Sequence, residues 1–295
     1  MPVPLTDSGL VGARGSAAAH PSSYATQASS WQTFVAEELA TTSVLIRRDL
    51  TRFFREKSRV FGALMQPLLF WLMIGTGMAG SFRLPGSEHV SYLEYFYPGV
   101  LVMIVLFSAI FTTMSVIEDR HSGFLQSVLV APGSRVSLVL GKCLGSTMVA
   151  LIQGALFILL APFAGFAFSN MAFGPLLGGL LLTSLALCSL GFAVAWWLDS
   201  TSGYHVVMSV LLLPLWILSG AMFPGRPGSI MQLVVSANPL SYAVAAVRRG
   251  VYGSVLPAGM PELAAQGSAA LELGVLVVFC ALSLLFAVRV CQRLR

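Results

Sequence analysis

The stretch with the densest set of reactive side chains is residues 118–135, EDRHSGFLQSVLVAPGSR. It begins with Glu118 and Asp119, two carboxylates that could move a proton or bind a basic partner. Adjacent helix positions face roughly 100° apart, so the two acids make a poor catalytic pair. Together with Arg120, which follows them, they indicate a charged contact with a partner.

The second half of this stretch is apolar and is bounded by turn residues. Gly123 permits a sharp turn at its start, and Pro132–Gly133 ends it. The apolar residues between them recur at i, i+1, i+4 and i+5, which predicts one stripe on a short helix: Phe124, Leu125, Val128 and Leu129. Such a stripe suits docking into a groove of another protein, and the alternative is a short helix lying on the bilayer.

Motifs for other chemistry are absent from the sequence. It contains no HExxH, no GxSxG, no CxxC and no GxxxxGK[ST]. The four histidines fall in predicted tails or loops: His20, His89, His121 and His205. We therefore expect no catalytic residues, no metal site and no cofactor in this chain, and any ATP must be bound by another protein.

A basic segment precedes the first long apolar run, TSVLIRRDLTRFFREKSRV at 42–60. At roughly 100° per residue its apolar side chains share one face, and its cations lie opposite: Arg48, Arg52, Arg55 and Arg59. This pattern predicts an amphipathic interfacial helix within 31–59, with the arginines toward anionic lipid headgroups or the cytosol. The alternative is a solvated helix next to the membrane.

The elements that would position these residues are membrane spans. The chain is 56% hydrophobic and only 10% charged, which is typical of a polytopic all-α membrane protein and does not favour nucleic-acid binding. We expect a disordered tail over 1–30, rich in Ser, Ala, Gly and Pro, and a membrane domain over 60–295. Its six predicted spans are about 60–82, 95–117, 143–163, 172–198, 206–222 and 269–288.

The uncharged segment 227–247 is too long to ignore as a further span candidate. A seventh span would place the basic C-terminus outside, against the positive-inside bias. Asn238–Pro239 also interrupts a helix there. The sequence therefore predicts two short re-entrant helices, about 228–236 and 240–250, and places both chain termini in the cytoplasm.

The order of these features resembles the transmembrane subunit of type-2 ABC transporters, a family of drug, lipid-linked glycan and nodulation-factor exporters. Four places carry the resemblance: the basic helix, YPGVLVM opening the second span, the 118–135 stretch, and the Phe-Pro and Asn-Pro-Leu-Ser-Tyr signature within 219–253. Their order and spacing cover roughly 40–295.

The resemblance implies a permease subunit of an ATP-driven exporter in the cell membrane. It would pair with a second permease subunit and with cytoplasmic ATPase subunits that bind ATP and Mg²⁺. The stretch from Glu118 to Arg135 would be the ATPase-coupling helix, and an outer gate would include Phe223, Pro224, Asn238, Pro239 and Leu240. The apolar spans favour an amphiphilic or hydrophobic substrate. The alternatives are a channel, a secondary transporter or a membrane anchor, and, with less support, an intramembrane enzyme.

Overall fold

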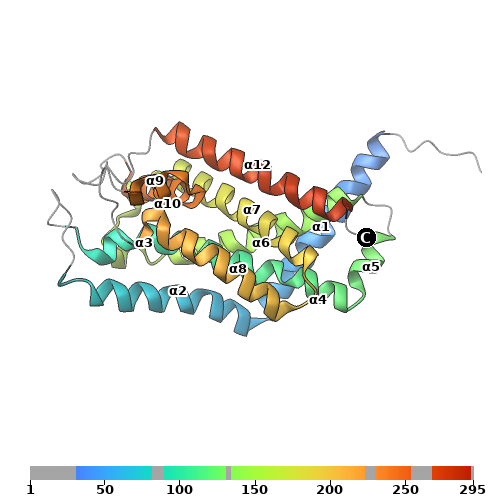
Figure 1. The fold of residues 1–295 in the computed structure, drawn as a ribbon, viewed down its shortest axis with the longest axis horizontal. Helices are drawn as coiled ribbons and strands as arrows, with labels where there is room; N and C mark the ends of the chain where they lie inside the picture. Colours follow the sequence, from blue (N-terminus) through green and yellow to red (C-terminus); the bar gives the residue numbers. More distant parts are fainter. Residues whose placement is uncertain (1–30, 82–89, 131–133, 223–229, 254–267, 294–295) are drawn as a thin grey trace, which may run out of the picture.

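The computed structural model describes residues 31–81, 90–130, 134–222, 230–253 and 268–293 (Figure 1). Over these residues the chain is helical and has no strand. Six of the described helical segments are long and apolar enough to cross a membrane, which confirms the predicted all-α polytopic class. The predicted tail at 1–30 lies outside the described residues.

The six candidate spans differ from the predicted boundaries mainly at their ends. The helices that form them are α2 (Lys57–Gly77), α3 (Tyr92–Thr113) with α4 (Ser115–His121), α6 (Arg135–Ile158), α7 (Phe173–Trp197), α8 (Thr201–Trp216) with the π-helical turn η3 (Ile217–Ala221), and α12 (Ala269–Arg293). The remaining elements are α1 (Trp31–Arg55), α5 (Phe124–Leu129), the 3₁₀ turns η1 (Ala161–Ala164) and η2 (Phe168–Asn170), α9 (Ile230–Ala237) and α10 (Pro239–Tyr252).

Serine caps set the start of three spans. Ser91, Ser134 and Ser200 each accept a hydrogen bond from a backbone N–H of the helix that follows. Each hydroxyl satisfies a donor that the first helical turn would otherwise leave unpaired. The third and fifth spans therefore begin earlier than the apolar runs predict, at Arg135 and Thr201 instead of about 143 and 206.

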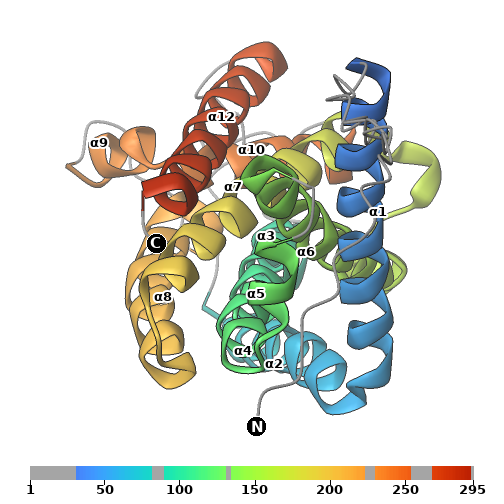
Figure 2. The same cartoon turned by 90° about the vertical axis from the view of Figure 1, so that its right-hand side faces the viewer.

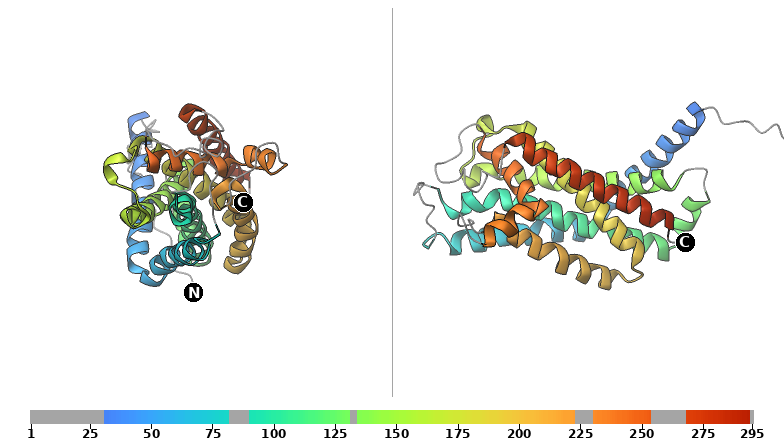
Figure 3. Two further views of the ribbon diagram at one scale, coloured as in Figure 1. Left: turned by 90° about the vertical axis from the view of Figure 1, so that its left-hand side faces the viewer. Right: turned by 45° about the horizontal axis from the view of Figure 1, so that its top comes forward.

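The helices form an elongated bundle with two distinct ends (Figures 1 and 3). One end, called the proximal end here, carries α1, α4, α5 and the end of α12. The other, called the distal end, carries α9 and α10. The two predicted short helices near 228–236 and 240–250 thus correspond to α9 and α10, while their re-entrant placement and the cytoplasmic location of the proximal end stay predictions.

The amphipathic segment is part of the packed fold. Instead of continuing to 59, α1 ends at Arg55, and α2 begins at Lys57. Figure 2 shows α1 running beside α6. Their backbones come close at Gly141 and Gly145 of α6, where an added Cβ would meet Leu45 and Asp49 of α1. The inward face of α1 thus rests on protein rather than on lipid.

Candidate functional site

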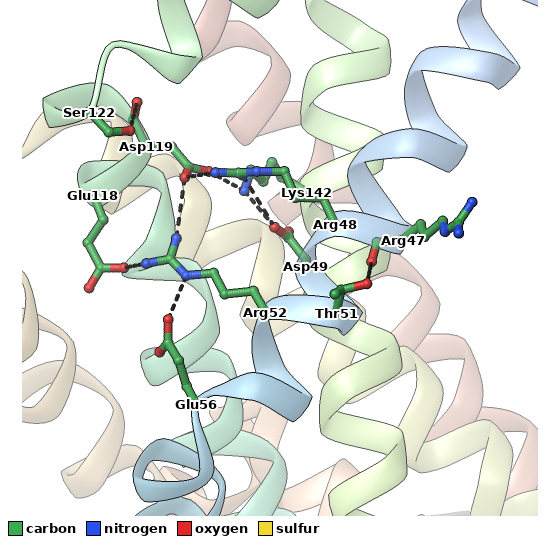
Figure 4. Close-up of polar contacts among 10 residues, drawn as sticks. All are labelled: Arg47, Arg48, Asp49, Thr51, Arg52, Glu56, Glu118, Asp119, Ser122 and Lys142. Atoms are coloured by element: carbon green, nitrogen blue, oxygen red, sulfur yellow. Dashed lines mark hydrogen bonds and ion pairs between the residues drawn. The ribbon is translucent and has the colours of Figure 1, made fainter.

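A cluster of charged side chains joins α1 to α4 and α6 at the proximal end (Figure 4). The guanidinium of Arg48 donates to both carboxylate oxygens of Asp119, Nη1 to Oδ2 at 2.7 Å and Nη2 to Oδ1 at 2.5 Å. The ammonium of Lys142 lies between two carboxylates, 2.8 Å from Oδ1 of Asp49 and 2.5 Å from Oδ2 of Asp119. One lysine on α6 therefore ties α1 to α4, and the forked arginine contact fixes the same junction from α1.

Three members of this cluster are buried. Lys142 and Asp119 are each 1% exposed and Asp49 is 8% exposed. Burying charges is costly unless they are paired with good geometry, which the contacts to Lys142 and Arg48 provide. Burial raises the pKa of Asp49, and Lys142 offsets part of that rise. The hydrogen bond to Asp119 raises the pKa of Arg48.

A second arginine of α1 extends the cluster to the other carboxylate of α4. Arg52 contacts Glu118 through Nη2, donates from Nε to Glu56 at 2.8 Å, and places Nη1 3.3 Å from Asp119. Arg48 and Arg52 thus contact the acidic pair at 118–119 while staying partly exposed, and their placement toward headgroups or the cytosol stays a prediction. The acids already have basic partners within the chain, although they were predicted to orient an external contact.

The other two basic residues of the predicted face differ from these. Arg55 is exposed at the end of α1, where contact with lipid or solvent remains open to it. The side chain of Arg59 lies outside the described part of the structure.

The predicted turn and short helix after α4 are present. Gly123 adopts a left-handed backbone with φ of 75°, a conformation that glycine takes at little cost, and α5 follows directly. The predicted apolar stripe does not stay on one surface. Leu125 is 2% exposed, and the ring of Phe124 lies 3.6 Å beneath the guanidinium carbon of Arg48. Val128 packs partly buried against the core.

The surface that α5 presents to solvent is therefore different from the predicted stripe. Leu129 is 41% exposed and Val130, which follows the helix, is 87% exposed. Gln126 and Ser127 are exposed as well. Pro132 and Gly133, predicted to end the helix, lie outside the described residues. A partner that docks here would meet Leu129 and Val130 rather than Leu125.

Arg120 fixes the same turn to the end of α7. Its Nη2 donates to the carbonyl of Trp196 at 2.6 Å, and its Nη1 donates to Oδ1 of Asp199 at 2.7 Å. His121 contacts the carbonyl of Asp199 at 2.9 Å. A groove of about 450 Å³ opens beside these contacts, lined by Arg120, Leu125, Gln126, Leu129, Trp196, Trp197 and Asp199. Three consecutive residues, 118–120, therefore link α4 to α1, α6 and α7.

Those residues of the predicted outer gate that the structure describes lie at the distal end. Asn238 caps α10 by accepting from the backbone N–H of Leu240 at 3.0 Å, and its Nδ2 donates to the carbonyl of Leu215 at 2.6 Å. Pro239 occupies the first turn of α10, and Leu240 is 1% exposed. Phe223 and Pro224 lie outside the described residues.

The sequence interpretation did not identify two charged contacts that the structure contains. One is the buried link of Asp49 and Lys142 described above. The other joins Arg249 of α10 to Glu272 of α12, with Nη2 to Oε1 at 2.7 Å and Glu272 fully buried. Among the described residues no group of three His, Cys, Asp or Glu side chains could hold a metal ion.

Comparison with known proteins adds a family and several relatives. The family described as ABC-2 type transporter matches residues 41–252, well over half of the chain. The ycf38 transport permease of Cyanophora paradoxa is 28% identical over 70% of this chain and 72% of its own length. The daunorubicin resistance ABC transporter permease protein DrrB1 of Streptomyces coeruleorubidus is 26% identical over 74% of this chain and 77% of its own.

A third relative comes from Mycobacterium tuberculosis. The protein named as doxorubicin resistance ABC transporter permease DrrC is 24% identical over 73% of this chain and 76% of its own length. The family match includes α1 from residue 41 onward and continues through α10, and this region contains the charged cluster.

Proposed function

We propose, from the premise that this chain belongs to the ABC-2 type transporter family as a multi-pass permease subunit, that it forms the membrane path of an exporter driven by a separate ATPase. The ATPase would bind ATP and Mg²⁺, because this sequence has no phosphate-binding loop of its own. A second permease subunit would complete the path, and the assembly would work in the cell membrane.

The observation that supports this proposal most directly is the charged cluster at the base of α5. A partner pressing on Leu129 and Val130 would move α5 together with α4, since only Ser122 and Gly123 separate the two helices. The contact from Asp119 to Arg48 would pass that movement to α1, and the contact to Lys142 would pass it to α6.

Contacts across a buried charge network resist separation. Each buried ion would lose its partner if one helix moved alone, and that loss is costly in a low-dielectric environment. The cluster therefore couples the helices so that they move as one body, which is what a motion driven by ATP at the proximal end requires. Arg120 extends the same body to the end of α7.

The substrate class is proposed from two relatives. DrrB1 and DrrC are named for resistance to daunorubicin and doxorubicin. We propose an amphiphilic or hydrophobic compound for this chain too, consistent with spans that are apolar along most of their length.

Reconstitution tests the proposal. The chain is purified from its native membrane in mild detergent, and the ATPase that co-purifies is identified and placed with it in proteoliposomes. We expect uptake of daunorubicin into the vesicles only with the ATPase and hydrolysable ATP. Uptake by the chain alone, driven by a proton or sodium gradient, would contradict an ATP-driven mechanism and favour a secondary transporter.

A further inference from the structure

The distal end of α8 is broken at the turn η3, and within the described residues the regular helix does not continue beyond it. Pro214 lies inside α8, and the helix continues as the π-helical turn η3. Within that turn Gly220 has a left-handed φ of 78°, which ends the regular backbone. A carbonyl freed in this way needs a new donor, because hydrocarbon offers none.

Side chains from two other elements supply those donors. The hydroxyl of Tyr95 in α3 donates to the carbonyl of Gly220 at 3.0 Å. The hydroxyl of Tyr92, one turn earlier in α3, donates to the carbonyl of Met222 at 3.0 Å. Arg248 of α10 approaches the same Gly220 carbonyl with Nη2 at 3.5 Å. All three side chains are at most 1% exposed, so no water competes for these acceptors.

Further contacts hold the broken segment on either side. The indole of Trp216 donates to the carbonyl of Gly99 in α3 at 2.8 Å. Asn238, at the start of α10, donates to the carbonyl of Leu215. The segment is thus bound from α3 and from α10 through single hydrogen bonds, in addition to the packing of the fully buried Ala221 next to Gly99.

Arg248 is under-satisfied in this arrangement. Its guanidinium lies over the ring of Tyr95, 4.7 Å from the ring centre, and its Nε has no partner among the described residues. Within the described part of the chain no carboxylate forms an ion pair with it, whereas the adjacent Arg249 binds Glu272. A buried guanidinium with an unused donor raises the free energy of the closed conformation. The contacts of Arg248 therefore stabilise this conformation less than a fully paired guanidinium would.

We propose that Tyr92, Tyr95 and Arg248 form a latch on the distal end of α8, and that Ile217–Met222, whose regular backbone ends at Gly220, moves away from α3 and α10 when the latch opens. The latch stands on the contacts alone. Its role as the outer gate of the transport path rests on the proposed function, and would place the gate in the π-helical turn rather than at Asn238–Leu240.

Hydrogen–deuterium exchange of the full chain in lipid nanodiscs tests the latch, with no ATPase or substrate present. The measured quantity is the exchange rate of the backbone amides of Ile217–Met222, which reports local opening. Tyr95→Phe removes one donor and keeps the ring. We expect these amides to exchange about fivefold faster, the factor that matches about 1 kcal/mol for one hydrogen bond. Tyr92→Phe should act in the same direction.

Tyr97→Phe is the matched control. Tyr97 lies in the same helix, and its hydroxyl donates to the carbonyl of Phe157 in α6 at 2.8 Å, away from η3. We expect this variant to leave the exchange of Ile217–Met222 unchanged. Wild-type exchange in both Tyr95→Phe and Tyr92→Phe would overturn the latch. An equal rise in Tyr95→Phe and Tyr97→Phe would overturn it too, by showing a general loosening of α3.

The two proposals fail separately. If the latch is absent, the exchange of Ile217–Met222 does not respond to Tyr95→Phe, and ATP-dependent uptake of daunorubicin can still occur. If the chain does not work with an ATPase, ATP-dependent uptake fails, but Tyr95→Phe still speeds the exchange of Ile217–Met222.

Discussion

Lys142 and Asp49 form a buried ion pair, with Nζ of the lysine 2.8 Å from Oδ1 of the aspartate. The two residues come from α6 and α1, which are far apart in the sequence, and both side chains are more than nine-tenths covered. Asp119 of α4 shares the same ammonium. The three helices are therefore joined through one cation, whose removal leaves two buried carboxylates with weaker support.

Replacing that cation should destabilise the fold strongly. Lys142→Met leaves Asp49 with only Arg48, whose Nη1 lies 3.9 Å from Oδ1, and leaves Asp119 with only its arginine contacts. Breaking a buried pair costs about 3–5 kcal/mol. We expect a large drop in the thermal unfolding midpoint of the purified protein in detergent. Adding Asp49→Asn to the variant should restore part of the loss, because one uncompensated charge is removed. The control Glu56→Gln breaks the more exposed pair with Arg52 and should cost about 0.3–0.5 kcal/mol.

If Lys142→Met were as stable as this control, that result would contradict the buried ion pair of Lys142 with Asp49.

The forked contact between Arg48 and Asp119, which joins α1 to α4, should also affect transport. Arg48→Lys keeps the charge but cannot donate two parallel bonds to Asp119 or cover the ring of Phe124. We expect ATP-dependent export to fall roughly tenfold, equivalent to about 1.4 kcal/mol, while the ATPase still co-purifies. Arg47→Lys, at the neighbouring exposed position, is the matched control and should export normally. Normal export by Arg48→Lys would show that the forked contact is not needed.

The exposed end of α5 should decide whether the ATPase binds. Leu129→Ser with Val130→Ser changes two exposed side chains, so we expect less ATPase to co-purify and the unfolding midpoint to stay the same. Leu125→Ala is the contrasting variant, because its side chain is buried and the substitution should cost about 2–5 kcal/mol of stability. Full recovery of the ATPase with the double variant would place its contact elsewhere.

Much of this site could be predicted from the sequence because its signals are local. The turn at Gly123 and the short helix after it follow from turn chemistry and apolar spacing, and both are present. Which residues of that helix face inward could not be predicted. Periodicity places Phe124 and Leu125 on one apolar stripe. In the structure, however, Phe124 packs under Arg48, whereas Leu125 is buried in the interior.

The helical periodicity of α1 gives a weaker indication that one of its charged residues is buried. At roughly 100° per residue, Asp49 falls between Leu45 and Phe53 on the apolar side of α1. A carboxylate there needs a partner, which indicates burial but cannot name Lys142, because that pairing depends on how α1 crosses α6. The predicted third span starts at about 143, which places Lys142 at its border, where charged residues usually lie. Neutralisation by two carboxylates lets Lys142 lie buried inside α6, which begins at Arg135 after its Ser134 cap.

A close approach of two backbones should make Gly250 intolerant of a side chain. A Cβ at this position of α10 would lie 2.5 Å from Cβ and 2.6 Å from Cα of Leu176 in α7. The Gly250 carbonyl also accepts from the backbone of Ala172 at 2.8 Å, which holds the helices in place. We expect Gly250→Ala to cost about 1–3 kcal/mol, read as a lower unfolding midpoint. Gly174→Ala is the control, since its Cβ would meet nothing within 4 Å; equal midpoints for the two variants would argue against the close contact.

The acid side of the stability profile should depend on Glu38. Its carboxylate accepts from the backbone N–H of Ser134 at 2.8 Å and from its hydroxyl at 2.7 Å, which ties α1 to the start of α6. Partial burial works to raise the pKa of Glu38, but the hydrogen bonds from Ser134 outweigh it and the pKa is lowered from 4.5. A lowered pKa in the folded state means that the stabilisation is complete above about pH 4.5 and is lost as the pH falls through the folded value. We therefore expect the wild type to unfold at a higher temperature than Glu38→Gln at pH 7. The corresponding difference in the free energy of unfolding should be less than about 1 kcal/mol. This difference should vanish in stronger acid. A difference that stays constant between pH 7 and strong acid would show that the charge of Glu38 is not its source.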